Sequence, residues 1–306
     1  MATAELHKLI PSEMTQSSLV RLLQITDPCG RYAEHKELLA AFEQQVFYYQ
    51  GTEFIEWVEE RLVEEMREFL GCSLVESRMI SGQMANMTVF SAMVDYRNRT
   101  ERRSEPARLP LVMNNHIGKG GHLSSQPMGA LRDYVAKNPI TEKYAVINFP
   151  VLRDDPYCID LQETEALLDS YDPELIILGK SMILYPEPVE DIRKMLEAKS
   201  VRPVLMYDMA HVIGLIGPHF QDPFSEGADI ITGSTHKTFF GSQRGIIGAA
   251  FEEESPEYEL WQAIQRRSFP GAVSNHHLGT LLGMLMASLE MNVFKESYQT
   301  QVLANA

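Results

Sequence analysis

The stretch that decides the fold reads VLMYDMAHVIGLIGPHFQDPFSEGADIITGSTHKT and spans residues 204–238. A first apolar run ends at Asp208, with His211 three residues later, and a second ends at the polar sequence THKT, which contains Lys237. Short runs that are apolar on both faces are typical of strands buried in a parallel sheet. In such a sheet, ligands bind at the carboxyl ends of the strands. The stretch therefore predicts two neighbouring strands whose ends bring an aspartate and a lysine into one site.

Apolar runs and helical patterns alternate along the rest of the chain. Strands that are separated by helices form a parallel sheet covered on both faces, so this alternation predicts an α/β fold with a mostly parallel sheet flanked by helices. The predicted strands are 109–115, 144–150, 174–179, 203–208, 228–233 and 244–251. The predicted helices are 54–70, 85–96, 125–137, 161–170, 188–198 and a long one from about 277.

The composition is that of an ordinary globular protein, and it limits the classes of binding partner that we expect. The chain has 306 residues, of which 44% are hydrophobic and 23% charged, and its net charge is −15. An acidic surface repels nucleic acid and anionic membranes, so we expect neither as a partner. No apolar stretch approaches the roughly 20 residues that span a bilayer, and the start lacks the pattern of a signal peptide. Three scattered cysteines without a CxxC pair favour a reducing compartment, so we expect a cytoplasmic protein.

The residue types at the predicted strand ends suit one kind of cofactor chemistry. A lysine directly after a buried strand is desolvated, which lowers its pKa and makes its amine nucleophilic toward carbonyls. Enzymes that use pyridoxal phosphate need such a lysine, together with an aspartate that pairs with the cationic ring nitrogen. Lys237 and Asp208 are candidates for these two roles. The stretch Ser81-Gly82-Gln83, at the start of a predicted helix, offers N–H groups to a phosphate, and His122 on a glycine-rich loop is available to stack on the ring.

Other chemistries lack support from motifs. The sequence contains no GxGxxG after a first strand, no GxxxxGK[ST] and no GxSxG, which disfavours dinucleotide binding, P-loop chemistry and serine hydrolysis. The adjacent residues His276 and His277 would point about 100° apart on a helix, and no carboxylate stands at ligand spacing beside them. We therefore expect no metal site.

A set of ordered motifs extends through most of the chain. The clearest are YDMAHVIGLIG and GSTHKT, in which Lys237 follows Asp208 by 29 positions. Together the motifs resemble the serine hydroxymethyltransferases, which are fold-type I pyridoxal phosphate enzymes, and the resemblance runs from about residue 9 to residue 306. The further motifs are LIPSEM (9–14), RYAEH (31–35), YYQGTEF (48–54), SGQMAN (81–86), GKGGHL (118–123), FPG (269–271) and FKESYQTQVLANA (294–306).

The resemblance implies an aspartate aminotransferase-like large domain and a role for each matching residue. Lys237 would be the Schiff-base lysine, Asp208 the partner of the pyridine nitrogen and His122 the stacked ring. Glu34 would handle the proton of the substrate hydroxyl. The phosphate would be held by Ser81, Gly82 and Gln83 with Ser234 and His236, while Ser181 and His211 would lie on the O3′ side of the cofactor. The substrate would contact Ser12, Tyr32, Tyr48, Tyr49 and Arg244, and a pterin would contact Ile117 and Leu123.

The family also implies partners and a division of the chain. We expect a homodimer with a shared active site that acts on an amino acid together with an aldehyde or with tetrahydrofolate. Residues 1–50 would form an N-terminal arm with active-site loops, and residues 51–290 the large domain that binds pyridoxal phosphate. Residues 291–306 would begin a helix that leads to a small domain absent from this chain, which leaves open a fragment or a pairing with a separate polypeptide.

Departures from the family pattern keep three functions open. About seven extra residues follow RYAE, Gln83 stands at the second serine of the phosphate loop, and AVSNHH at 272–277 replaces a glycine-rich stretch. The first hypothesis is cleavage or formation of the Cα–Cβ bond of β-hydroxy-α-amino acids by hydroxymethyl transfer between serine and glycine. The second is an L-threonine aldolase or transaldolase that passes a glycyl unit to another aldehyde. The third is a non-catalytic partner subunit or fragment.

Overall fold

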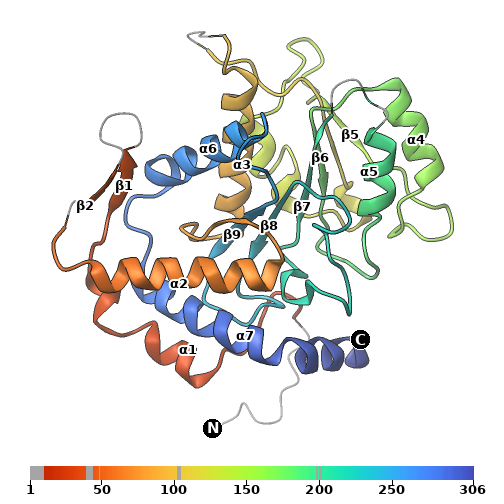
Figure 1. Ribbon diagram of the computed structural model, residues 1–306. Helices are drawn as coiled ribbons and strands as arrows, with labels where there is room; N and C mark the ends of the chain where they lie inside the picture. The colour runs from red at the N-terminus through yellow and green to blue at the C-terminus, as the bar shows by residue number, and fades with distance from the viewer. Residues whose placement is uncertain (1–9, 39–43, 48, 102–104, 198, 200–201) are drawn as a thin grey trace.

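A seven-stranded sheet forms the centre of the molecule (Figure 1). The computed structural model describes residues 10–38, 44–47, 49–101, 105–197, 199 and 202–306. The strand order is β3-β9-β8-β7-β6-β4-β5, in which β4 to β8 run parallel and β9 is antiparallel to both of its neighbours. The strands are β3 (Leu74–Glu76), β4 (Val112–Asn114), β5 (Val146–Asn148), β6 (Leu175–Leu178), β7 (Val204–Asp208), β8 (Ile230–Ser234) and β9 (Gly245–Ala249).

The sheet is buried on both faces, as its continuous apolar runs predict. Along β6, Leu175 and Ile177 pack into one core cluster, while Ile176 and Leu178 pack into the other. This alternation follows from the two-residue period of a strand. Each of the six predicted strands overlaps an observed one, and the α/β fold with a mostly parallel sheet is confirmed.

Helices cover each face of the sheet. α3 (Gly82–Arg97) and α6 (Tyr258–Arg266) pack on one face, and α2 (Glu53–Leu70), α5 (Val189–Glu197) and α7 (Leu278–Asn305) pack on the other. α4 (Leu161–Ser170) lies beside α5 at the β5 end of the sheet. α2 ends at Gly71, which adopts the left-handed conformation (φ 70°) that glycine allows at a helix C-terminus.

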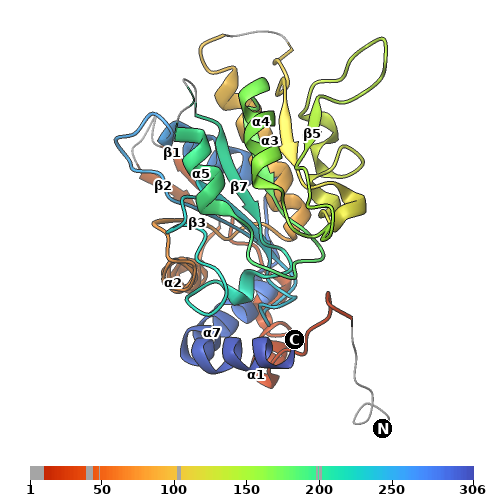
Figure 2. The same cartoon turned by 90° about the vertical axis from the view of Figure 1, so that its right-hand side faces the viewer.

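The N-terminal arm lies at one end of the molecule. α1 (Ser18–Leu23) and the turn Asp27–Gly30 pack against α7, which in turn packs against α2 (Figure 2). α7 continues without a break across residues 290 and 291, so the proposed boundary there coincides with no change in secondary structure and stays a prediction. Of the helices in the described ranges, none combines the length and the apolar character that crossing a bilayer requires.

The predicted helix over 125–137 is wrong. This segment forms two short turns, Leu123–Ser125 and Ala130–Asp133. Pro127 lacks a backbone donor, and a Cβ on Gly129 would lie 2.2 Å from the backbone oxygen of Leu123, so the chain folds back on itself instead of continuing as a helix.

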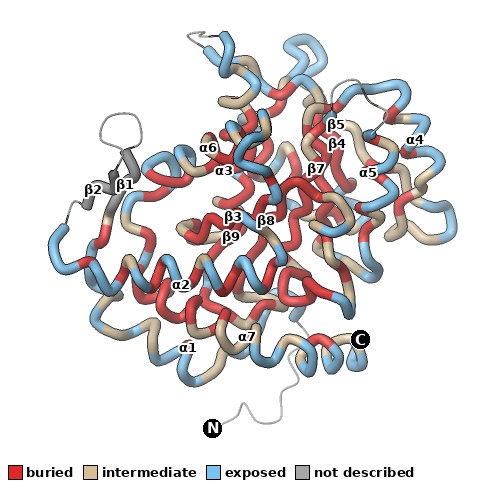
Figure 3. Tube along the Cα trace, viewed as in Figure 1, coloured by how far each residue is buried: buried red, intermediate tan, exposed pale blue. Residues whose placement is uncertain are grey.

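Other features were not predicted from the sequence. Among them are the strand β3, the antiparallel direction of β9 and the helix α6. The antiparallel hairpin of β1 (His35–Leu38) and β2 (Gln44–Phe47), which stands apart from the sheet at the left of Figure 1, was not predicted either. In Figure 3 the buried residues lie mainly on the strands and on the inner faces of the helices. The hydrophobic core is therefore formed between the sheet and the helices on its two faces.

Candidate active site

Asp208 is the central residue of the site. It ends β7 and is 1% exposed. His122 Nδ1 lies 2.5 Å from Asp208 Oδ2, Asn86 Nδ2 donates to the same oxygen at 2.7 Å, and the Ala210 N–H donates to Oδ1 at 3.2 Å. Burial alone would raise the pKa of Asp208, but the charge and hydrogen bond of His122, with the bonds from Asn86 and Ala210, lower it below its ordinary value. Asp208 is therefore ionised at neutral pH.

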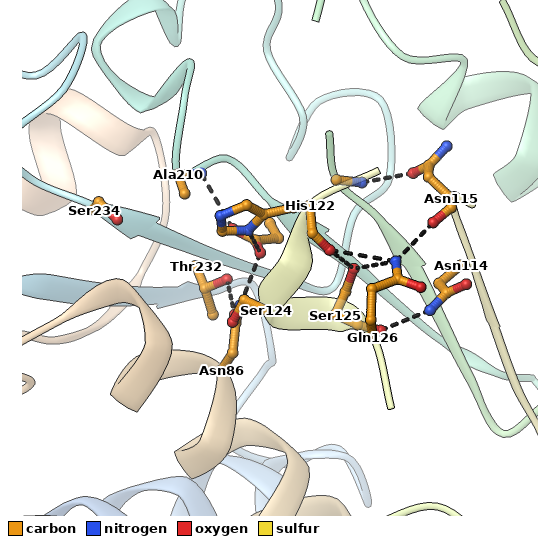
Figure 4. A network of polar contacts seen from close by, with 12 residues as sticks. Asn86, Asn114, Asn115, His122, Ser124, Ser125, Gln126, Ala210, Thr232 and Ser234 are labelled. Atoms are coloured by element: carbon orange, nitrogen blue, oxygen red, sulfur yellow. Dashed lines mark hydrogen bonds and ion pairs between the residues drawn. The ribbon is translucent and has the colours of Figure 1, made fainter. Parts of the chain in front are cut away.

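Asn86 is a site residue that the sequence reasoning missed. Figure 4 shows its side chain between Ser124 and Thr232, below His122. Its amide donates to Ser124 Oγ at 2.6 Å as well as to Asp208, and its carbonyl accepts from Thr232 Oγ1 at 2.5 Å. The available signal was a polar amide on the buried face of α3, within the quoted motif SGQMAN.

Lys237 lies three residues beyond the end of β8, the strand that pairs with the Asp208 strand β7. Its Nζ donates to Ser234 Oγ at 2.9 Å. Burial lowers the pKa of the Lys237 amine, and the charge of Asp208 opposes this shift only in part. The two residues singled out in the opening stretch thus come together because β7 and β8 are adjacent and parallel. Register pairs Asp208 with Thr232 across these strands.

Two histidines line the same site in their neutral form. Burial, followed by the positive charge of Lys237, lowers the pKa of both His211 and His236 to about 4. The His211 ring lies 5.4 Å from the His122 ring, nearly perpendicular to it. The Nδ1 atoms of His211 and His236 are buried and have no hydrogen-bond partner among the described residues. Polar atoms of this kind are available to a bound ligand. We call Asp208, His122, His211, Ser234 and Lys237 the strand-end cluster.

The start of α3 lies against the end of β8. Ser81 caps the helix through its Oγ, which accepts from the Met84 N–H at 3.1 Å. Gly82 approaches so closely that a Cβ there would lie 2.4 Å from Ser234 Oγ. The helix N-terminus, which favours anions, is therefore placed beside the strand-end cluster. Gln83, in contrast, is exposed on the outside of the first turn.

The loop that carries His122 is fixed by the end of β6. The His122 N–H donates to Gly179 O at 3.0 Å, and the Ser181 N–H donates to Gly120 O at 2.8 Å. These two bonds bring the backbones of His122 and Ser181 close together. Ile117 and Leu123, on either side of this loop, are 38% and 52% exposed.

The predicted substrate-side residues form a separate exposed group. Tyr32 and Tyr49 have ring centroids 5.7 Å apart, and desolvation, followed by the charge of Glu34, raises the pKa of Tyr49. No described contact joins these three residues to the strand-end cluster. Ser12 is also exposed, and Tyr48 lies outside the described residues.

Arg244, which the resemblance assigns to the substrate, is held by a set of internal hydrogen bonds. It is fully buried, and its two terminal nitrogens donate to Ser77 O, His276 O, His277 O and Thr280 Oγ1, and to His276 Nδ1. These partners occupy both terminal nitrogens, whereas the Nε atom is buried and has no partner among the described residues. Arg244 therefore lies inside the protein, and its predicted contact with substrate stays a prediction.

The fold and the gathered residues define a class, an α/β protein of fold type I with its polar site at the carboxyl ends of parallel strands. The chain belongs to the serine hydroxymethyltransferase family, whose model matches residues 8–306. It is 35% identical over 299 residues to the serine hydroxymethyltransferase of Archaeoglobus fulgidus, which covers 97% of this chain and 60% of that protein. The enzyme of Korarchaeum cryptofilum is 33% identical over 300 residues, with 97% and 63% covered.

A solved structure shows the same fold. The crystal structure of L-threonine transaldolase from Pseudomonas fluorescens aligns with a TM-score of 0.75 at 23% identity, and it covers 97% of this chain and 60% of that one. The chain thus spans about three fifths of the length of the relatives that it matches.

Proposed function

We propose that this chain carries the cofactor-binding part of a pyridoxal phosphate enzyme that breaks and forms the Cα–Cβ bond of β-hydroxy-α-amino acids. The reaction we favour is hydroxymethyl transfer between serine and glycine, the activity for which the family is named. The observation that carries the proposal is the pairing of a buried, ionised Asp208 with a desolvated Lys237 at the ends of adjacent strands. The three free cysteines, Cys29, Cys72 and Cys158, support action in the cytoplasm.

The residues present fit pyridoxal phosphate. Within the described part of the chain, Asp208 Oδ1 accepts only a 3.2 Å bond from the Ala210 N–H, and a carboxylate oxygen accepts two bonds, so capacity remains for a protonated ring nitrogen. The start of α3 suits a phosphate, because its first residue, Gly82, lies in contact with Ser234. The unpartnered Nδ1 atoms of His211 and His236 supply further polar groups at the site.

We therefore assign to these residues the contacts with pyridoxal phosphate that the resemblance implies. Asp208 would hold the ring nitrogen and His122 would lie on the ring. Ser181 and His211 would lie on the O3′ hydroxyl side of the ring. The phosphate would be held by Ser81, Gly82, Gln83, Ser234 and His236.

The protonation states of Asp208, Lys237 and His211 suit the chemistry of this cofactor. Pyridoxal phosphate, when bound, supplies an aldehyde that an amine attacks and a cationic ring that withdraws electrons from Cα. Asp208 stays ionised at neutral pH and can keep a proton on a nitrogen that faces it. Lys237 has a lowered pKa, so a larger fraction of its amine is unprotonated and nucleophilic. His211 is neutral above about pH 4, so its ring can accept a hydrogen bond without bringing a positive charge into the site.

We propose that the substrate side of the site is completed in a homodimer. Tyr32 and Tyr49 are 56% and 42% exposed, and the stacked pair Phe54 and Trp57 is 54% and 55% exposed. Exposed aromatic groups of this kind are typical of protein interfaces. A second copy that covers them would receive Glu34 as the carboxylate for the substrate hydroxyl. Mixing Glu34→Gln and Lys237→Ala chains tests this, because one intact site in each mixed dimer should restore part of the activity that each variant lacks.

A second candidate function is an L-threonine aldolase or transaldolase. The observation that favours it is the sequence AVSNHH, which brings His276 and His277 where the family has a glycine-rich stretch. The fold shared with the transaldolase of Pseudomonas fluorescens is compatible with this reaction. Acetaldehyde release from threonine without tetrahydrofolate would favour the transaldolase, whereas a strict requirement for serine and tetrahydrofolate would favour hydroxymethyl transfer.

Trapping of the cofactor tests the proposal itself. The chain is mixed with pyridoxal phosphate and reduced with borohydride, and its peptides are analysed by mass spectrometry. We expect the cofactor on Lys237, and no such adduct in the Lys237→Ala variant. Absence of the adduct from the wild-type chain would favour a non-catalytic partner subunit instead.

A further inference from the structure

The loop that carries His236 and Lys237 is closed by Arg244. The Thr235 N–H donates to the Arg244 backbone oxygen at 3.0 Å, and Thr235 Oγ1 donates to the same oxygen at 3.1 Å. Residue 245 continues into β9, and its N–H donates to Met79 O at 3.0 Å. The lysine loop, residues 235–244, is therefore tied at its base to the segment that leads to α3.

The side chain of Arg244 reaches away from this loop to two other parts of the fold. Its Nη2 donates to Ser77 O at 3.0 Å, and its Nη1 donates to His276 O at 2.5 Å and to Thr280 Oγ1 at 3.0 Å. Arg244 is 0% exposed, and burial lowers its pKa to about 10. A cation in this position is costly unless nearby groups compensate its charge.

His276 supplies a link between this cation and a carboxylate. Its Nδ1 lies 3.0 Å from Arg244 Nη2, and its Nε2 lies 2.6 Å from Glu59 Oε1. A guanidinium has only donors, so His276 Nδ1 must accept and the ring proton must stand on Nε2, from which it is donated to Glu59. Both His276 and Glu59 are buried. The contacts thus fix one tautomer of a neutral imidazole.

The surrounding charges favour this arrangement. The negative charges of Glu59 and Glu76 both stabilise the positive charge of Arg244. Glu76 also forms an ion pair with Arg78 at 2.6 Å. A proton on His276 Nδ1 would face the N–H groups of Arg244 and bring two positive charges together. The chain of contacts from Arg244 through His276 to Glu59 is therefore stable only with His276 as acceptor on one side and donor on the other.

The same segment also holds the N-terminal arm. Asn275 Nδ2 donates to Arg31 O at 2.9 Å, one residue before Tyr32. Residues 275 and 276 thus connect three elements: the lysine loop, α2 through Glu59, and the arm that carries the proposed substrate-side residues. Their placement gives a structural role to AVSNHH, a departure from the family pattern to which the favoured reaction, hydroxymethyl transfer, assigns no role.

We propose that Arg244 and His276 are positioning residues, and that the Arg244–His276–Glu59 chain holds the lysine loop closed against the segment that leads to α3. By keeping the loop closed, these three residues keep water from the Lys237 amine. The effect on Lys237 rests on the proposed function, whereas the closure of the loop does not.

Hydrogen exchange of the cofactor-free chain tests the closure. In the variant His276→Leu the Arg244–Glu59 link is lost, and we expect the peptide over 235–245 to exchange at least about tenfold faster, the ratio that corresponds to one buried hydrogen bond. In His276→Gln, the amide offers an acceptor to Arg244 and a donor to Glu59, so exchange should stay within about threefold of wild type. Unchanged exchange in His276→Leu, or no rescue by His276→Gln, overturns the proposal.

Two further variants test whether the effect is specific to the His276 side chain. His277→Asn is the matched control: His277 is exposed, contributes only its backbone oxygen and has a positive φ of 60°, which asparagine tolerates. Its exchange should match that of wild type, and faster exchange over 235–245 would count against a specific role of His276. If His276→Leu does not fold, Glu59→Gln, which keeps an acceptor but removes a charge, should accelerate the same peptide by about threefold. No change there would equally overturn the proposal.

Trapping of pyridoxal phosphate provides the second readout. An opened loop hydrates the Lys237 amine, so the pH at which half of the chains are labelled should move upward in His276→Leu and return in His276→Gln. A midpoint that does not move in His276→Leu refutes the effect on Lys237. If the wild-type chain is not labelled at all, the proposed function fails while the exchange experiment still decides on the closure.

Discussion

Replacing Asn86 with alanine should remove the main neutral support of the buried Asp208 carboxylate. The amide donates to Asp208 Oδ2 at 2.7 Å, and Asp208 is 1% exposed. A hydrogen bond to a charged group contributes about 1.5–3 kcal/mol, and the Thr232 hydroxyl would lose its acceptor in the same change. We therefore expect Asn86→Ala to lower the free energy of unfolding by about 3 kcal/mol at neutral pH.

The pH dependence of this loss identifies its cause. The pKa of Asp208 is lowered in the folded state, so ionised Asp208 contributes stability that is fully present above the unfolded pKa of about 3.9 and is lost as pH falls through the folded pKa. Asn86→Ala raises the folded pKa. The difference between wild type and variant should therefore be constant between about pH 5 and 8 and shrink as pH falls below about 4.

Guanidinium unfolding at several pH values measures this difference, and Asn114→Ala is the matched control. Asn114 is as fully buried as Asn86, but its amide partners, Ser125 O and the side chain of Asn148, are both neutral. Its loss should not depend on pH. A loss in Asn86→Ala that is equally independent of pH down to about 3.5, or no loss at all, would refute the electrostatic role of Asn86.

Three other outcomes can be measured on the same chain. Lys180→Met leaves the carboxylate of Glu187 buried without its cation at 2.5 Å and should cost about 3–5 kcal/mol in urea unfolding, most of which the double variant with Glu187→Leu should recover. Gly245→Ala would bring a Cβ to 2.1 Å from a backbone oxygen and should lower the Tm by several degrees, whereas Gly30→Ala, with nothing within 4 Å, should leave it unchanged. The NMR signal of His211 should titrate near pH 4, and a midpoint near the ordinary value of 6.5 would contradict its burial.

Six strands of the central sheet could be predicted because an apolar run is a local property of the sequence. Runs such as VLMYD and ADIITGS are apolar on both faces, and each predicted run overlaps an observed strand. The helix expected over 125–137 failed for a local reason as well, since Pro127 and a close approach at Gly129 interrupt it. The direction of β9 could not be predicted, because a short apolar run reads the same in either direction.

The site was only partly visible in the sequence. Asp208 and Lys237 could be paired because both follow strands that are neighbours along the chain. The contact between Asn86 and Asp208 joins residues 122 positions apart, and no spacing rule connects them. The partners of Arg244 were equally hidden in the sequence, because Ser77 and Thr280 lie 167 and 36 positions away from it.

The sequence by itself determined the layers of the fold, the family and the two ionisable residues at the strand ends, because periodicity and ordered motifs are written along the chain. Only the tertiary structure decided the state of those residues. Burial lowers the pKa of Lys237, and donors from two distant segments keep Asp208 ionised. The tertiary structure also set the tautomer of His276, because a pKa and a proton's position depend on which groups lie within a few ångströms in space.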